Sequence, residues 1–259
     1  MKKIFIVLCL LFAVNLSARA DLTVDEIINR ANIASYYSGN DGRSNVKMVI
    51  TDSQKRERTR EFVILRKTLQ QGGNQNFYVY FEKPGDVRKM VFMVKKQVEK
   101  DDDRWLYMAN LDLVKRIAAG DKRTSFVGSD FLYEDVSGRN PKEDNHSLIK
   151  KEGGYYYLKS APKRPETVEF THYTVLINEK TFIPEKIEFY KGDKLYRRVS
   201  SEKIENIQGF NTVTQSKVEN FETGGFTVNT MTNIKYNINI PDDIFTERYL
   251  RRPPTQWLK

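Results

Sequence analysis

Residues 104–135 read RWLYMANLDLVKRIAAGDKRTSFVGSDFLYED, and this stretch divides a chain of short strands into two halves. Apolar and polar residues roughly alternate over 104–108 and 113–118, which predicts two strands joined by a tight turn at 110–112. Gly120 and the charged residues after it interrupt the strand pattern. The stretch therefore begins with a β-hairpin.

A short helix is predicted next, over residues 130–136. Ser129 can cap its first turn, Asp130 suits the positive end of a helix, and Gly138 provides a stop. A helix this short is not stable alone. We therefore expect it to lie against the sheet, with Phe131, Leu132 and Val136 turned inward.

Upstream, residues 23–37 predict an amphipathic helix. Thr23 and Glu26 form a capping-box pattern, and apolar residues recur at helical spacing from Val24 to Tyr37. Gly39 and Gly42 end the pattern. The polar face is mixed in charge and not lysine-rich, which favours packing on the protein's own sheet over docking on a membrane.

Most of the remaining chain has the two-residue period of β-strands. Apolar residues alternate in four strands before the central stretch, near 46–50, 62–64, 77–81 and 90–94. Seven more are predicted after it, at 147–151, 155–159, 168–177, 182–190, 194–205, 212–221 and 226–236, with turn residues between them. So many antiparallel strands must curl to limit their edges, as a barrel or half-barrel.

The first 20 residues have the three parts of a secretory signal peptide: a basic start, an apolar run and the site Ala18-Arg19-Ala20. The run is too short to cross a bilayer, which needs about 20 apolar residues. Cys9 is the only cysteine and lies inside the run, so neither a lipid anchor nor a disulfide is expected. We predict cleavage after Ala20, one domain over residues 21–259, and a periplasmic location.

The whole chain has a net charge of +9, of which three positive charges fall in the first 20 residues. Nucleic acid is a poor partner for an exported chain without a recognisable binding module. An anionic lipid surface fits better, although simple solubilising charge fits equally.

Residue types that carry catalysis are not grouped in this sequence. His146 and His172 fall on different predicted elements without metal-ligand or triad spacing, and Ser129 lacks the G-x-S-x-G pattern of a nucleophile. The acidic run 101–103 lacks the spacing of a calcium loop. We therefore expect no enzyme activity, no metal and no cofactor.

Several motifs of the chain are shared with a known family. They are DDRWLYM at 102–108, KRI at 115–117 and the pattern D-K-R-x-S-F-x-G-S-D-F-x-Y-E-D at 121–135, with FEKPGDVR at 81–88 and IPDDIFT at 240–246. In these motifs the chain resembles the bacterial outer-membrane lipoprotein-sorting proteins, a LolA-like family. The resemblance implies an incomplete antiparallel β-barrel, with an N-terminal helix and short lid helices over an apolar concave face that holds acyl chains.

Large apolar side chains are the candidate lipid-binding residues, although each also fits an ordinary packed core. They are Phe81, Phe92, Trp105, Tyr107, Phe126, Phe131, Tyr133, Ile187 and Phe189. Basic residues of the central stretch are candidates for contact with a head group or an acidic partner. These are Arg104, Arg116, Lys122 and Arg123, and simple surface charge is the competing explanation.

The resulting hypothesis is a periplasmic carrier for acyl chains of lipoproteins or other lipids. The resemblance implies partners on both sides, an inner-membrane transporter and an outer-membrane acceptor. The alternative is a non-catalytic interaction module of an RND- or ABC-type envelope transport system, with a barrel filled by its own side chains. The sequence leaves the oligomeric state open, with a monomer as the expectation.

Overall fold

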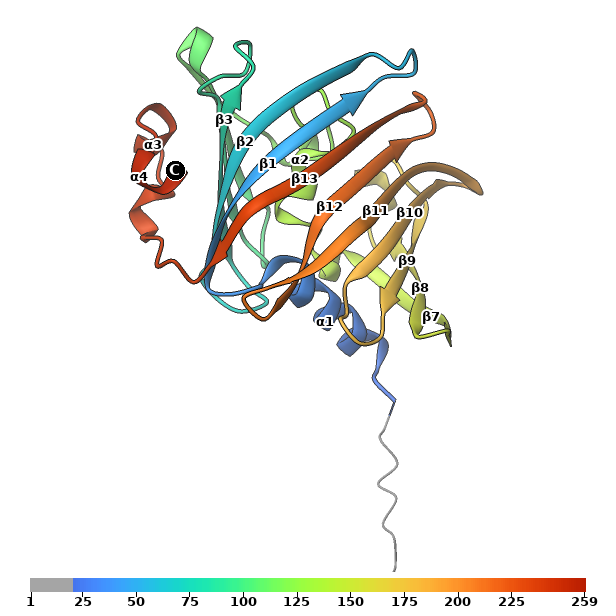
Figure 1. Ribbon diagram of the computed structural model, residues 1–259. Helices are drawn as coiled ribbons and strands as arrows, with labels where there is room; N and C mark the ends of the chain where they lie inside the picture. Colours follow the sequence, from blue (N-terminus) through green and yellow to red (C-terminus); the bar gives the residue numbers. More distant parts are fainter. Residues whose placement is uncertain (1–20) are drawn as a thin grey trace, which may run out of the picture.

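The computed structural model describes residues 21–259, so the predicted signal peptide lies outside the described residues (Figure 1). The fold is one 13-stranded sheet in the order β6-β5-β4-β3-β2-β1-β13-β12-β11-β10-β9-β8-β7, and every neighbouring pair is antiparallel. The strands are β1 (Asp41–Thr51), β2 (Glu57–Thr68), β3 (Gln75–Lys83), β4 (Val91–Lys96), β5 (Asp103–Met108), β6 (Leu113–Arg116), β7 (Asp144–Glu152), β8 (Tyr155–Pro162), β9 (His172–Asn178), β10 (Pro184–Lys191), β11 (Lys194–Ile207), β12 (Phe210–Asn220) and β13 (Gly225–Tyr236).

The strand order explains the role of the central stretch. Each half of the chain is a meander, and the two halves join where β1 pairs with β13. β6 and β7 follow one another in the chain but lie at opposite edges of the sheet. Residues 117–143, called the crossing segment below, must therefore pass from one edge of the curved sheet to the other.

The crossing segment covers the concave face of the sheet. Phe126 and Tyr133 pack there with Met48, Phe62 and Phe92, which are fully or almost fully buried. The segment also contains α2 (Tyr133–Ser137), which lies inside the curve of the sheet in Figure 1. The expected half-barrel with a helical cover over an apolar concave face is confirmed.

The predicted start of α2 is wrong. Leu132 is the N-cap residue, and its backbone N–H donates a hydrogen bond to the Asp135 carboxylate. The Ser129 hydroxyl instead donates to the Phe126 carbonyl at 2.7 Å, so it closes a turn before the helix. Gly138 ends the helix as predicted.

The first helix, α1 (Val24–Tyr36), begins with the predicted capping box. The Thr23 N–H donates to the Glu26 carboxylate at 2.8 Å. Ile27 and Ala31 are buried against aromatic and branched residues of β8, β9 and β10. The helix therefore packs on the sheet, as its mixed polar face predicted.

The convex face is covered by the C-terminal residues, whose helices the sequence did not predict. α3 (Arg248–Arg251) and α4 (Thr255–Leu258) lie outside the curve of the sheet (Figure 1). Leu250 is fully buried there against a cluster from β2 to β5. The Arg43 guanidinium holds the end of the chain by donating to the carbonyls of Trp257 and Leu258.

Five short 3-10 turns complete the described chain. The first, η1, forms the turn of the predicted hairpin between β5 and β6, where Asp112 has the left-handed conformation. The turns are η1 (Ala109–Leu111), η2 (Ala119–Asp121), η3 (Pro141–Glu143), η4 (Pro165–Thr167) and η5 (Asp242–Ile244).

Candidate functional site: an apolar cavity on the concave face

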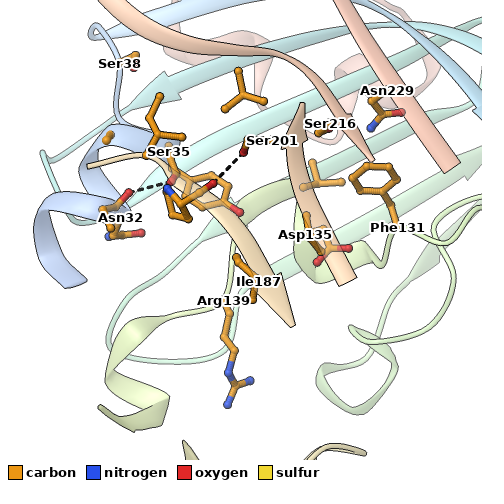
Figure 2. Close-up of a pocket in the computed structure, with 18 of the residues that line it drawn as sticks. Asn32, Ser35, Ser38, Phe131, Asp135, Arg139, Ile187, Ser201, Ser216 and Asn229 are labelled. Atoms are coloured by element: carbon orange, nitrogen blue, oxygen red, sulfur yellow. Dashed lines mark hydrogen bonds between the residues drawn. The ribbon is translucent and has the colours of Figure 1, made fainter. Parts of the chain in front are cut away.

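A cavity of about 430 Å³ lies between the concave face of the sheet, α1 and the crossing segment. This volume falls within the usual range of small-molecule sites, about 300–1,000 Å³. Figure 2 shows side chains from α1, α2 and several strands converging on it. Its wall is mainly apolar and includes Ile28, Met48, Phe62, Ile64, Phe77, Val79, Val136, Val175, Ile177, Val199, Met231 and Ile234.

Several apolar side chains of this wall are only half-buried. Ile64, Phe131, Val136, Ile187 and Met231 all face the cavity without being covered by other parts of the described chain. Interiors of proteins are normally packed to crystal-like density, so such a gap is unusual. The barrel is therefore not filled by its own side chains, which the alternative hypothesis required.

Four of the nine candidate lipid-binding residues line the cavity. Phe126 and Phe131 reach it from the crossing segment, and Ile187 and Phe189 reach it from β10. Phe126 is 2% exposed and forms part of the floor, whereas Phe131 and Ile187 are half-buried and form accessible wall. The structure brings these four residues together from elements about sixty residues apart in the chain.

Three further candidates lie beside the cavity in an aromatic cluster. Phe92 packs against Tyr133 with ring centroids 5.0 Å apart, and Phe81 lies 5.8 Å from Phe126. Tyr133 meets Phe126 edge-on at 5.5 Å. This cluster fixes the crossing segment to the sheet and supports the cavity without lining it.

The last two candidates lie on the other face of the sheet. Trp105 and Tyr107 belong to the convex cluster with the C-terminal residues. The Arg116 guanidinium lies over the Trp105 ring at 5.4 Å, and Arg251 lies over Tyr107 at 5.6 Å. The side chains of Trp105 and Tyr107 are separated from the cavity by the sheet, because successive side chains of a strand point to opposite faces and these two belong to the convex face.

The four basic candidates are engaged in ion pairs. Arg104 is 3% exposed and pairs with Asp102 at 2.6 Å, and Arg116 pairs with Asp103 near the surface. Lys122 pairs with Glu143 at 3.2 Å. Contact of Arg104 or Lys122 with a head group would compete with these pairs, whereas the Arg116 side chain is 67% exposed.

Arg123 is the basic candidate that lines the cavity, and its partners hold it in place. Its guanidinium binds Glu134 and Glu169, the latter at 2.7 Å, and lies 4.8 Å from the Phe170 ring. Burial alone would raise the pKa of Glu134, but Arg123, Lys122 and Arg139 hold it below its ordinary value. These charges anchor the crossing segment to β7 and to the loop before β9.

α1 and α2 meet above the cavity in a close contact. Gly138 has φ of +77°, and a Cβ atom there would lie 2.5 Å from the Tyr36 ring. The Lys96 ammonium donates to the Ser137 carbonyl at 2.6 Å and lies over the same tyrosine at 5.2 Å. Burial lowers the pKa of Lys96 to about 8. The two covering helices therefore meet at one buried point.

The cavity also contains residues that the sequence did not identify. Ile28 and Ala34 come from α1, Val199 from β11, and Met231 and Ile234 from β13. The helical spacing of the first two and the alternation of the other three were visible in the sequence, but these patterns could not say which face of each element would remain uncovered.

Within residues 21–259, no group of three His, Cys, Asp or Glu side chains is placed to hold a metal ion. None of the helices described over the same residues is both long and apolar enough to cross a membrane.

Solved structures of similar fold support this architecture. A DUF1329 family protein from Desulfovibrio piger is 26% identical, with a TM-score of 0.80 over 88% of this chain and 97% of its own. A domain from Vibrio parahaemolyticus described as outer membrane lipoprotein-sorting is 22% identical, with a TM-score of 0.79 over 88% of this chain and 97% of its own. A LolA superfamily protein from Nitrosomonas europaea is 21% identical, with a TM-score of 0.69 over 88% of this chain and 100% of its own.

The open sheet, its helical cover and these neighbours define a LolA-like half-barrel, and the predicted resemblance is confirmed. Residues 73–252 match the model of a family described as "-like: Uncharacterized protein", and the chain belongs to that family. No curated protein matches the sequence.

Proposed function

We propose that this protein is a non-catalytic carrier that binds the acyl chains of a lipid or lipoprotein in its concave cavity. The observation that carries the proposal is the unfilled apolar space of about 430 Å³, walled by half-buried aliphatic and aromatic side chains. Transfer of one methylene group from water to such a space contributes about 0.8 kcal/mol. A long acyl chain therefore supplies enough free energy for binding without any chemical reaction.

The carrier acts in the periplasm as a single folded unit over residues 21–259. The signal-peptide pattern of residues 1–20 supports export. The lipoprotein-sorting description of the Vibrio parahaemolyticus domain supports the same class of cargo by analogy of fold. Its partners are then an inner-membrane transporter that supplies the lipid and an outer-membrane acceptor that receives it.

Phe131 offers the sharpest test of the cavity, because it lines the space but is only half-buried. The Phe131→Asp variant places a carboxylate in the wall, where an acyl chain cannot solvate it. We measure binding by the displacement of the neutral fluorescent probe N-phenyl-1-naphthylamine. In this variant the phospholipid concentration needed to displace the probe should rise more than tenfold. Its free energy of unfolding should fall by only about 1 kcal/mol.

The matched control is Phe81→Ala, because Phe81 is fully buried in the aromatic cluster and does not line the cavity. This change should cost about 3–5 kcal/mol of folding free energy. The carrier function would be contradicted if the wild-type protein took up neither the probe nor phospholipid. If Phe131→Asp lost binding and stability equally, Phe131 would be an ordinary core residue.

A further inference from the structure

One end of the cavity carries a positive charge, that of Arg66 on β2. Arg66 lies in register with Phe77 of β3 on one side and Gly42 of β1 on the other. Residues directly opposite in antiparallel strands share a face, and all three line the cavity. Two positions earlier on β2, the half-buried Ile64 belongs to the apolar wall. The cavity therefore changes from a charged end to an apolar wall within one strand.

The Arg66 guanidinium has only neutral hydrogen-bond partners among the described residues. It donates to the Thr68 hydroxyl at 2.6 Å and to the carbonyls of Ser38 and Gly39. These bonds are made by Nη1 and Nη2, so Nε has no partner within the described chain. The nearby Asp41 carboxylate instead accepts two backbone N–H groups. Arg66 is thus held in place without a counter-ion.

A half-buried charge without a counter-ion is costly to the fold. Burial lowers the pKa of Arg66, because the guanidinium loses water that would stabilise its charge. Carbonyl and hydroxyl oxygens replace only part of that water. An anion at this end of the cavity would supply the missing counter-charge and accept the free Nε–H. Hydrogen bonds between such ions are about twice as strong as those between neutral groups.

The other arginines of the cavity wall differ from Arg66. Arg123, Arg139 and Arg197 each pair with a carboxylate of α2. Arg197 also has two nitrogen atoms without a partner, but the described chain encloses both of them. Arg43 binds the last carbonyls of the chain on the convex side. Arg66 is therefore the wall cation, within the described residues, that is best placed to receive an anion.

We infer that Arg66 binds the anionic oxygen of an acidic lipid, a carboxylate or a phosphate, while the acyl chain lies along the apolar wall. The two ends are separate in space: Ser38, which accepts from Arg66, and the apolar Phe131 lie at opposite sides of the cavity in Figure 2. This inference rests on the carrier function and specifies its cargo, a lipid with a negative charge at the end of its acyl chain.

The test uses three 12-carbon competitors that differ at one end: laurate, dodecyl phosphate and 1-dodecanol. Each displaces N-phenyl-1-naphthylamine at pH 8 from the exported protein and from the Arg66→Gln variant. We expect at least one anion to bind the wild type about 10- to 100-fold more tightly than dodecanol, the gain typical of a hydrogen bond to a charged group. Arg66→Gln should lose this preference and leave dodecanol unchanged. The tighter of the two anions distinguishes a carboxylate cargo from a phosphate cargo.

Lys67→Gln is the matched control, because Lys67 follows Arg66 on β2, points to the opposite face and pairs with Asp242. It removes the same charge and should keep the full preference for the anion. Arg66→Lys separates charge from structure: it keeps the positive charge but loses the planar fork that binds the loop after α1. It should therefore retain part of the preference.

Three outcomes would overturn the inference. Wild-type protein that binds neither anion more tightly than dodecanol would contradict it, whether or not any variant folds. An equal loss of dodecanol binding in Arg66→Gln would show that Arg66 only holds the loop after α1. Loss of the preference in Lys67→Gln would show an effect of net charge and not a site. Failure of all three competitors to displace the probe would instead contradict the carrier function on which the inference depends.

Discussion

The ion pairs of Arg123 show how single residues hold the cover of the cavity. Its guanidinium joins the buried Glu134 of α2 to Glu169, which precedes β9. Burial opposes ionisation of Glu169, but the hydrogen bonds and charge of Arg123 lower its pKa to about 2. The crossing segment is thus tied to the second half of the sheet by charge, whereas the Phe126 cluster ties it to the first half.

This pKa gives the protein a specific sensitivity to acid. A carboxylate whose pKa is lower in the folded state stabilises the fold above its ordinary pKa of 4.5. That stability is lost as the pH falls from about 4.5 through about 2. Urea unfolding at pH 6, 4.5 and 3 should show a shallower decline in stability for Glu169→Gln than for the wild type.

Glu166→Gln is the control for this titration, since Glu166 is exposed and has no salt bridge among the described residues. The stability of Glu166→Gln should decline with falling pH as steeply as that of the wild type. If Glu169→Gln declined as steeply as the wild type too, the Arg123 pair would make no contribution to the stability of the fold.

Among the elements, the C-terminal helices have a structural task distinct from that of the cavity cover. Leu250 of α3 is fully buried on the convex face, on the far side of the sheet from the cavity. Leu250→Ala should lower the free energy of unfolding by about 2–5 kcal/mol. Displacement of the probe by phospholipid should remain at the wild-type level, measured at a temperature where the variant is folded.

Leu111→Ala provides the comparison, because Leu111 is 69% exposed in the turn between β5 and β6. Its stability should change by less than about 0.5 kcal/mol. Loss of lipid binding by folded Leu250→Ala would mean that the convex cover also controls the cavity, contrary to the separation described here.

Most elements could be predicted from the sequence because their signals are local. The capping box of α1, the β5–β6 hairpin and the alternation in β1 are each formed by residues only a few positions apart in the chain. The start of α2 could not be predicted in this way, because a serine such as Ser129 can either cap a helix or close a turn, here by donating to the Phe126 carbonyl. The four-residue helices α3 and α4 are too short to show a helical period.

The site was harder to predict than the fold, because the sheet is apolar on both faces where the C-terminal residues cover it. β3 carries Phe77, Val79 and Phe81 toward the concave cluster and Tyr78 toward the convex one. Such a continuous apolar run indicates burial on both faces. The aromatic character of Trp105 and Tyr107 therefore could not tell cavity from convex core, and only the path of the C-terminal residues separates them.

At the scale of the whole molecule, the two meanders and the crossing segment enclose one space that neither half could form alone. β1 and β13 join the halves at the middle of the sheet, and the cavity draws residues from both. On the proposed carrier function, lipid would fill this space and add binding free energy to the folded state. A loaded protein should therefore unfold at a higher temperature than an empty one.

Native mass spectrometry of the exported protein, purified gently from the periplasm and then extracted with organic solvent, tests the carrier most directly. The account predicts a bound lipid or acylated peptide in a defined ratio to the protein. Protein that is empty when isolated and that also fails to take up added lipid would contradict it.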